Sequence, residues 1–180
     1  LLTSMIKERP LEEVIMKKQW NAKAQSWFLA NQPDSLVTTF SGKLNETTNL
    51  NSLNSTDVYI ILSGSNFRGS SSLELLINNL NPLLNVHVVG NNTEGNNTGS
   101  ITLYNSIDYD FGLRNMTHNV ALQPIVLSFL NQNDETYTNG FTPTIDLCLQ
   151  ENLLTLGVLG ESSDEILKRI LNHIETGTSG

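Results

Sequence analysis

Residues 58–100 decide how the chain folds, and they read VYIILSGSNFRGSSSLELLINNLNPLLNVHVVGNNTEGNNTGS. The continuous apolar run 58–62 predicts a strand that is covered on both faces. A turn follows over residues 63–69, then a helix over 72–80 that Pro82 closes, and then a second strand over 86–89. Two strands joined by a helix of this length predict a right-handed βαβ unit with parallel strands. The glycine- and asparagine-rich residues 90–99 then bring a loop back toward the serines that precede the helix.

Length and composition limit the class of protein. The chain has 180 residues, 38% of them apolar, which is enough for one globular domain with a real core. The formal net charge of −8 argues against nucleic acid and against an anionic membrane surface as partners. We expect no membrane span, because no apolar run reaches about 18 residues, and no signal peptide, because charged residues follow Leu1 closely. The single Cys148 excludes an internal disulfide, and its flanking residues predict a buried thiol on a strand.

The rest of the chain shows a coarse alternation of elements. We expect an N-terminal helical segment and an asparagine-rich connection over 1–57, a core over 58–176 and a loose tail over 177–180. The patterns predict a helix over 10–31, a polar connection over 41–57, a strand over 100–104, an apolar stretch over 120–130 that Pro124 interrupts, a turn over 136–143, a strand over 145–149 and an amphipathic helix over 162–174.

The serines before the central helix can be interpreted in two ways. Ser71-x-x-Glu74 is the pattern of a capping box, in which the hydroxyl accepts from the backbone of Glu74 and the carboxylate reaches back. Ser162-x-x-Glu165 repeats this pattern before the last helix. Alternatively, a serine at a helix N-terminus lies where free N–H groups stabilise an oxyanion, which suits a nucleophile. A nucleophilic serine also needs a base, either a histidine or a lysine of lowered pKa.

Several ordered segments carry a resemblance to a known family. They are SGS at 63–65, SSSLE at 70–74, LLINNLNP at 75–82, GNNTEGN at 90–96, GSITLY at 99–104, LQPIV at 122–126, YTNGFTP at 137–143 and LLTLG at 153–157. In this order and spacing they resemble the catalytic domain of tail-specific, or carboxyl-terminal processing, serine peptidases of the Ser–Lys type, in the version common in Bacteroidetes. The resemblance covers most of residues 58–176, and residues 1–57 match more weakly.

The resemblance assigns roles to residues around the serines. It places Ser71 at the nucleophile position, with Glu74 in a supporting or capping role and with Ser72 and Gly95 at the substrate-binding part of the site. The family has a lysine base where this chain has Asn96, and an amide cannot accept a proton at neutral pH. The turn before the helix is also about two residues longer than in the family, so Ser70 or Ser72 remain alternatives for the nucleophile.

No other residue is an evident replacement for the base. The lysines lie in helices or surface stretches, and we expect His87 to be a sheet histidine with satisfied partners. The three histidines, His87, His118 and His173, have no metal-ligand spacing, so neither a metal nor a cofactor is expected.

The resemblance implies an α/β fold of the crotonase-like type, seen in part, with a short and mostly parallel sheet and packed helices. It implies an endopeptidase that acts near the C-termini of protein or peptide substrates in the bacterial periplasm or cell envelope. Because Asn96 replaces the lysine, we expect this chain to be a catalytically impaired pseudoenzyme. A peptide-binding module without catalysis, and a piece with structural value only, are the alternatives. The family's upstream PDZ module and glycine-rich oxyanion segment are not among these residues, so we expect an incomplete oxyanion hole here.

Overall fold

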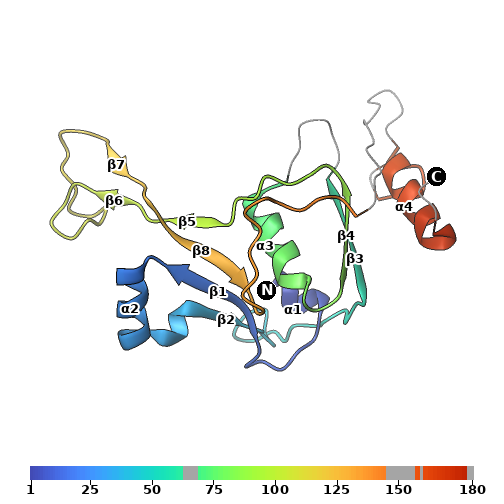
Figure 1. The fold of residues 1–180 in the computed structure, drawn as a ribbon, viewed down its shortest axis with the longest axis horizontal. Helices are drawn as coiled ribbons and strands as arrows, with labels where there is room; N and C mark the ends of the chain where they lie inside the picture. Colours follow the sequence, from blue (N-terminus) through green and yellow to red (C-terminus); the bar gives the residue numbers. More distant parts are fainter. Residues whose placement is uncertain (63–68, 145–156, 159, 178–180) are drawn as a thin grey trace. The chain divides into compact units, whose positions relative to one another are not determined.

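The structure is a computed structural model that describes residues 1–62, 69–144, 157–158 and 160–177. It divides into two compact units, each built from separate stretches of the chain (Figure 1). The first unit comprises Leu1–Ser52 and Asn97–Thr136, and the second comprises Leu53–Asn96 and Tyr137–Gly180. The predicted limits of a peptidase-like core at residues 58 and 176 stay a prediction.

The centre of the second unit is a strand–helix–strand element. Strands β3 (Asp57–Leu62) and β4 (Asn85–Gly90) are parallel, and helix α3 (Ser71–Leu80) connects them. The predicted parallel pairing is therefore confirmed, with elements that differ from the predicted ranges by about one residue. The helix packs on the two strands through a buried apolar cluster of Ile60, Leu62, Ile77 and Val88.

The last helix, α4 (Glu165–Thr176), belongs to the same unit. Its Ile170 is buried in a cluster with Val89 of β4, and it ends at Gly177, whose left-handed φ of 68° suits a C-terminal glycine. The predicted capping box at Ser162 is wrong: Asp164 is the N-cap and accepts from the backbone of Ile166 and Leu167. An aspartate two residues nearer the helix provides a carboxylate acceptor and displaces the serine from this role. The predicted strand over 145–149, with Cys148, lies outside the described residues.

The first unit contains an antiparallel sheet of four strands in the order β2-β1-β8-β5. Its strands are β1 (Val14–Trp20), β2 (Val37–Thr39), β5 (Thr98–Ser100) and β8 (Ile125–Asn131). The expected mostly parallel sheet is therefore wrong: among the described strands, only β3 and β4 pair in parallel, and every other pairing is antiparallel. What is observed is a mixed α/β fold.

The predicted helix over residues 10–31 is correct only in its second half. Residues 14–20 form β1 because they pair with β2 on one side and β8 on the other, and these long-range ladders override the local spacing of apolar residues. Helix α2 (Ala22–Asn31) then begins at Asn21, whose side chain accepts from the Ala24 N–H at 3.1 Å. The unit also contains helix α1 (Leu2–Ile6) and the short 3-10 helix η1 (Pro33–Leu36).

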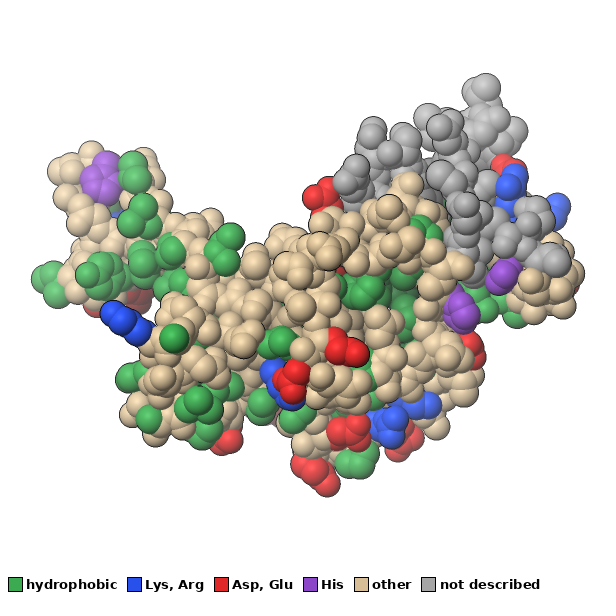
Figure 2. All heavy atoms as spheres, viewed as in Figure 1, with side chains coloured by type: hydrophobic (Ala, Val, Ile, Leu, Met, Phe, Trp, Pro, Cys, Tyr) green, Lys and Arg blue, Asp and Glu red, His purple; other side chains and the backbone are tan. Residues whose placement is uncertain are grey.

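Residues 101–124 form a projection beyond β5 and β8, which we call the β6–β7 arm (Figure 1). Strands β6 (Leu103–Tyr104) and β7 (Ala121–Leu122) pair antiparallel within it. The predicted strand over 100–104 is thus split between β5 and β6, and the predicted break at Pro124 is confirmed because it separates β7 from β8. Several apolar side chains lie on the arm's surface in Figure 2. The exposed large apolar residues of the arm include Ile107, Tyr109, Phe111, Leu113, Met116, Val120 and Leu122.

In the part of the chain that the structure describes, no helix has both the length and the apolar character needed to cross a membrane.

Candidate functional site

The three serines at the start of α3 are not equivalent. Ser70 has an extended backbone, with φ −112° and ψ 159°, and its side chain accepts from the Leu73 N–H at 3.3 Å. Ser70 is therefore the N-cap, and the predicted capping role of Ser71 is wrong by one residue. Ser71 and Ser72 are the first two helical residues, and both side chains are exposed. The hydroxyl of Ser71 thus lies at the positive end of α3 and is not used to cap it.

Glu74 connects the first turns of α3 to the loop that follows β4. Its side chain is only 1% exposed, and its two carboxylate oxygens accept from the backbone N–H groups of Gly95 at 2.5 Å and Asn96 at 2.9 Å. The predicted reciprocal capping bond is wrong, because both carboxylate oxygens accept from backbone N–H groups of this loop. Charge-assisted bonds of this kind compensate the burial of the carboxylate. The carboxylate instead fixes the main chain at position 96 against the helix.

The loop around Glu74 is backed by the turn over residues 137–141. The Thr93 N–H donates to the carbonyl of Phe141 at 3.1 Å, and the Phe141 N–H donates to the Thr93 hydroxyl at 2.7 Å. Gly95 and Gly140 have φ angles of 89° and 70°, and a Cβ at either position would overlap backbone atoms of the opposite segment. These two glycines allow the two loops to approach each other closely.

Tyr137 completes the surroundings of Glu74. Its side chain is buried and its ring stacks on Phe141, with 5.5 Å between the ring centroids. Burial, with a further contribution from the negative charge of Glu74, raises the pKa of Tyr137 to about 12. The phenol therefore stays neutral at physiological pH, and its environment favours a donor over a phenolate. The sequence motif 137–143 contains Tyr137, but nothing in its local pattern indicates proximity to Glu74.

The geometry brings position 96 close to the serine-bearing face of α3. Ser71 and Glu74 are three residues apart on one helix, so their side chains share a face. Because Glu74 binds the Asn96 N–H, the main chain at 96 lies beside that face. The Asn96 side chain is exposed. An amide in this place can donate and accept hydrogen bonds but cannot take up a proton from a serine at neutral pH.

His87 is already engaged by other residues of β3 and β4. Its Nε2 lies 3.2 Å from Asp57 Oδ1, and its ring stacks on Tyr59 with a centroid distance of 4.4 Å. Bonds from Thr56, His87 and Asn85 lower the pKa of Asp57. The expectation of a satisfied sheet histidine is confirmed. Within the described residues, no group of three or more His, Cys, Asp or Glu side chains could hold a metal ion.

Comparison with known proteins supports the fold of this chain. No family model and no curated protein matches it. Among solved structures, it is similar to the crystal structure of a "Putative S41 protease" from Bacteroides fragilis, with a TM-score of 0.68 and 22% sequence identity. The similarity covers 99% of this chain and 41% of the other, so the chain spans about two fifths of that protein's length. At this identity the comparison establishes a shared fold.

Proposed function

We propose that this chain derives from the catalytic domain of a serine peptidase, with Ser71 at the nucleophile position and Asn96 at the position of the missing lysine base. The observation that carries the proposal is the bond between the Glu74 carboxylate and the Asn96 N–H, which joins the serine-bearing helix to the loop of residue 96. The fold shared with a protein described as an S41 protease supports the same conclusion.

The expected chemistry follows from these positions. In an active enzyme the serine oxygen attacks a peptide carbonyl while the base takes the hydroxyl proton, and the tetrahedral oxyanion is held by N–H donors. Ser71 has the helix N-terminus needed to stabilise negative charge, but Asn96 has no place for the proton. Loss of a general base typically lowers the rate by about 10²–10⁴-fold. The protein is therefore catalytically impaired.

The substrate class in this proposal is an unstructured protein or peptide segment near a C-terminus, and the location is the periplasm or cell envelope. Both follow from the resemblance to tail-specific peptidases of the motifs around residues 70–74, 90–96 and 137–143. The crotonase-like character of the fold is part of the same proposal.

Restoring the base tests the proposal directly. The wild type and Asn96→Lys are incubated with an unstructured fluorogenic peptide, and the initial rates of cleavage are compared. We expect no turnover above background for the wild type and measurable turnover for Asn96→Lys. Robust cleavage by the wild type that Ser71→Ala abolishes would contradict the impaired state.

Three serine variants in the Asn96→Lys background identify which of Ser70, Ser71 and Ser72 is the nucleophile. Ser71→Ala removes the proposed nucleophile and abolishes the restored activity. Ser70→Ala removes only the cap, so it lowers stability by about 1 kcal/mol and retains activity. Ser72→Ala retains activity as well. Loss of activity in Ser72→Ala but not in Ser71→Ala would move the nucleophile by one residue.

A second candidate function is peptide binding without cleavage. Strand β5 lies at the edge of its sheet and pairs only with β8 among the described strands, so its other edge can accept an added strand. In the sequence, β5 begins two residues after Asn96. Saturable binding of the same peptide, with no turnover in wild type or in Asn96→Lys, would favour this function over the peptidase.

A further inference from the structure

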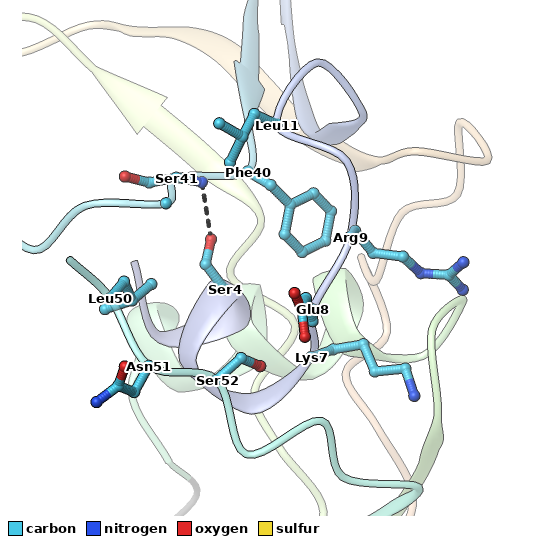
Figure 3. A pocket seen from close by; sticks show the side chains of 11 residues that line it. Ser4, Lys7, Glu8, Arg9, Leu11, Phe40, Ser41, Leu50, Asn51 and Ser52 are labelled. Atoms are coloured by element: carbon cyan, nitrogen blue, oxygen red, sulfur yellow. Dashed lines mark hydrogen bonds between the residues drawn. The ribbon is translucent and has the colours of Figure 1, made fainter.

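A second polar hollow lies wholly within the first unit and shares no residue with the serine site. We call it the Phe40 pocket, and it has a cavity volume of about 450 Å³. Residues from three segments, within 4–11, 40–42 and 50–52, line it (Figure 3). Leu11 and Leu50 provide the accessible apolar part of its lining, and Phe40 behind them is only 4% exposed. A concave site in which polar and charged groups converge beside a few apolar side chains can bind a small polar molecule.

The charges at the Phe40 pocket differ in sign from those of the chain as a whole. Lys7 and Arg9 provide two positive charges and Glu8 provides one negative charge, whereas the chain has 18 acidic and 10 basic residues. Figure 3 shows the Lys7 and Arg9 side chains extending to the same side of the pocket. Among the residues that line the pocket, the two cations outnumber the one carboxylate, which favours an anionic group on the ligand. Glu13, which does not line the pocket, is a competing carboxylate beside Arg9.

The Arg9 guanidinium is available to such a group. Its contact with Glu13 is 3.9 Å between Nε and Oε1, which is too long for a hydrogen bond. Both side chains of this pair are also partly exposed, so the attraction between them is weak. A carboxylate that approaches Arg9 can therefore form the paired hydrogen bonds for which a guanidinium is suited.

Ser4 adds a buried donor to the pocket. It is 4% exposed, and its hydroxyl oxygen accepts from the Ser41 N–H at 3.1 Å. Within the described residues, the Ser4 hydroxyl donates to no acceptor, although a hydroxyl group carries one proton to donate. Because buried polar groups are normally paired, an acceptor oxygen on a ligand in the pocket would complete the hydrogen bonding of Ser4.

We propose that the Phe40 pocket binds the α-carboxylate of an amino-acid-like ligand with a small apolar side chain. Arg9 and Lys7 bind the carboxylate, and the Ser4 hydroxyl donates to a ligand oxygen. Glu8 accepts from the nitrogen next to the ligand's α-carbon, and the apolar side chain packs on Leu11 and Leu50. Such a group occurs in a free amino acid and at the end of a peptide. The proposal does not depend on the peptidase-derived function.

Three ligands test the proposal on the intact chain by amide NMR. N-acetyl-leucine carries the carboxylate, N-acetyl-leucinamide lacks its charge, and leucine carries a free ammonium. We expect saturable shifts of the Ser41 amide signal with N-acetyl-leucine, and at least about tenfold weaker binding of the amide. Tighter binding of leucine than of N-acetyl-leucine identifies a free amino acid as the ligand class, and the reverse order identifies a peptide end.

A matched pair of charge variants locates the binding. Arg9→Gln removes one positive charge from the pocket, and we expect it to weaken N-acetyl-leucine binding by at least about tenfold. Lys23→Gln removes one positive charge from the exposed part of α2 in the same unit and should leave the affinity unchanged. Three results would overturn the proposal: no saturable shift, equal affinities for acid and amide, or equal weakening by the two variants.

Discussion

Large apolar side chains are buried in the β3–α3–β4 element and exposed in the β6–β7 arm. In the first, Leu62, Ile77 and Leu80 are almost completely buried. In the second, Ile107 is 95% exposed, and within the arm the described ring contacts join only Tyr104, Phe111 and Arg114. Apolar burial is the dominant favourable term in folding, so the β3–α3–β4 element contributes strongly to the stability of the second unit. The exposed arm contributes little to the stability of the first unit.

The largest effect is expected at the centre of the buried element. Leu80 has no exposed surface, so Leu80→Ala removes buried methyl groups and leaves a cavity. We expect the free energy of unfolding, measured with denaturant, to fall by about 2–5 kcal/mol. A loss below about 1 kcal/mol would contradict the difference between the two regions, because it would show that the β3–α3–β4 element also packs loosely.

A pair of glycine variants compares the turn over residues 137–141, which packs beside the β3–α3–β4 element, with the arm. Gly140→Ala places a Cβ against the Thr93 carbonyl at a φ of 70°, so it should cost about 1–3 kcal/mol of unfolding free energy. Gly112→Ala in the arm meets no atom within 4 Å, so it should change stability by less than about 0.5 kcal/mol. Equal effects of the two substitutions would show that the two loops backing Glu74 are not tightly packed.

Burial of Tyr137 in the second unit makes the stability of the fold depend on pH in the alkaline range. Tyr137 has a folded-state pKa of about 12, above the ordinary value of 10.0, so the native state holds this proton more tightly than the unfolded chain. The resulting stabilisation is fully present below about pH 10 and is lost as the pH rises toward 12. Denaturant unfolding at several pH values in this window should show the loss, and Tyr137→Phe should reduce it. An unchanged pH profile in Tyr137→Phe would assign the effect to other groups.

The smallest effect is expected in the arm. Ile107→Ser replaces an almost fully exposed side chain, so the free energy of unfolding should change by less than about 0.5 kcal/mol. Thermal unfolding followed by circular dichroism measures this, with Leu80→Ala as the sensitive reference. A loss above about 1 kcal/mol would show that the exposed surface of the arm is covered in solution.

The sequence predicted those parts of the fold whose signals are local. The apolar runs of β3 and β4, the serines before α3 and Pro82 after it each act within a few residues, and together they specify the parallel element. Strand β1 could not be predicted in this way, because its conformation depends on pairing with β8, more than a hundred residues later. Local apolar spacing in 11–20 indicated a helix, and tertiary pairing overrode it.

The candidate site shows the same limit at finer scale. The return of the loop toward the serines was predictable from the order of strand, helix and strand. Which serine caps the helix depends on the backbone angles of one residue. The direction of the Glu74 side chain depends on where the backbone N–H groups of Gly95 and Asn96 lie. The proximity of Tyr137 to Glu74 depends on contact between segments that are distant in the chain, so no short pattern indicated it.

The bonds from Glu74 have a consequence for how this chain can evolve. The carboxylate binds main-chain N–H groups at 95 and 96, and every amino acid except proline supplies such a group. The position of the loop is therefore insensitive to the identity of the side chain at 96. Under the proposed function, an exchange of asparagine for lysine at this position would change the chemistry of the site without moving the loop that carries it.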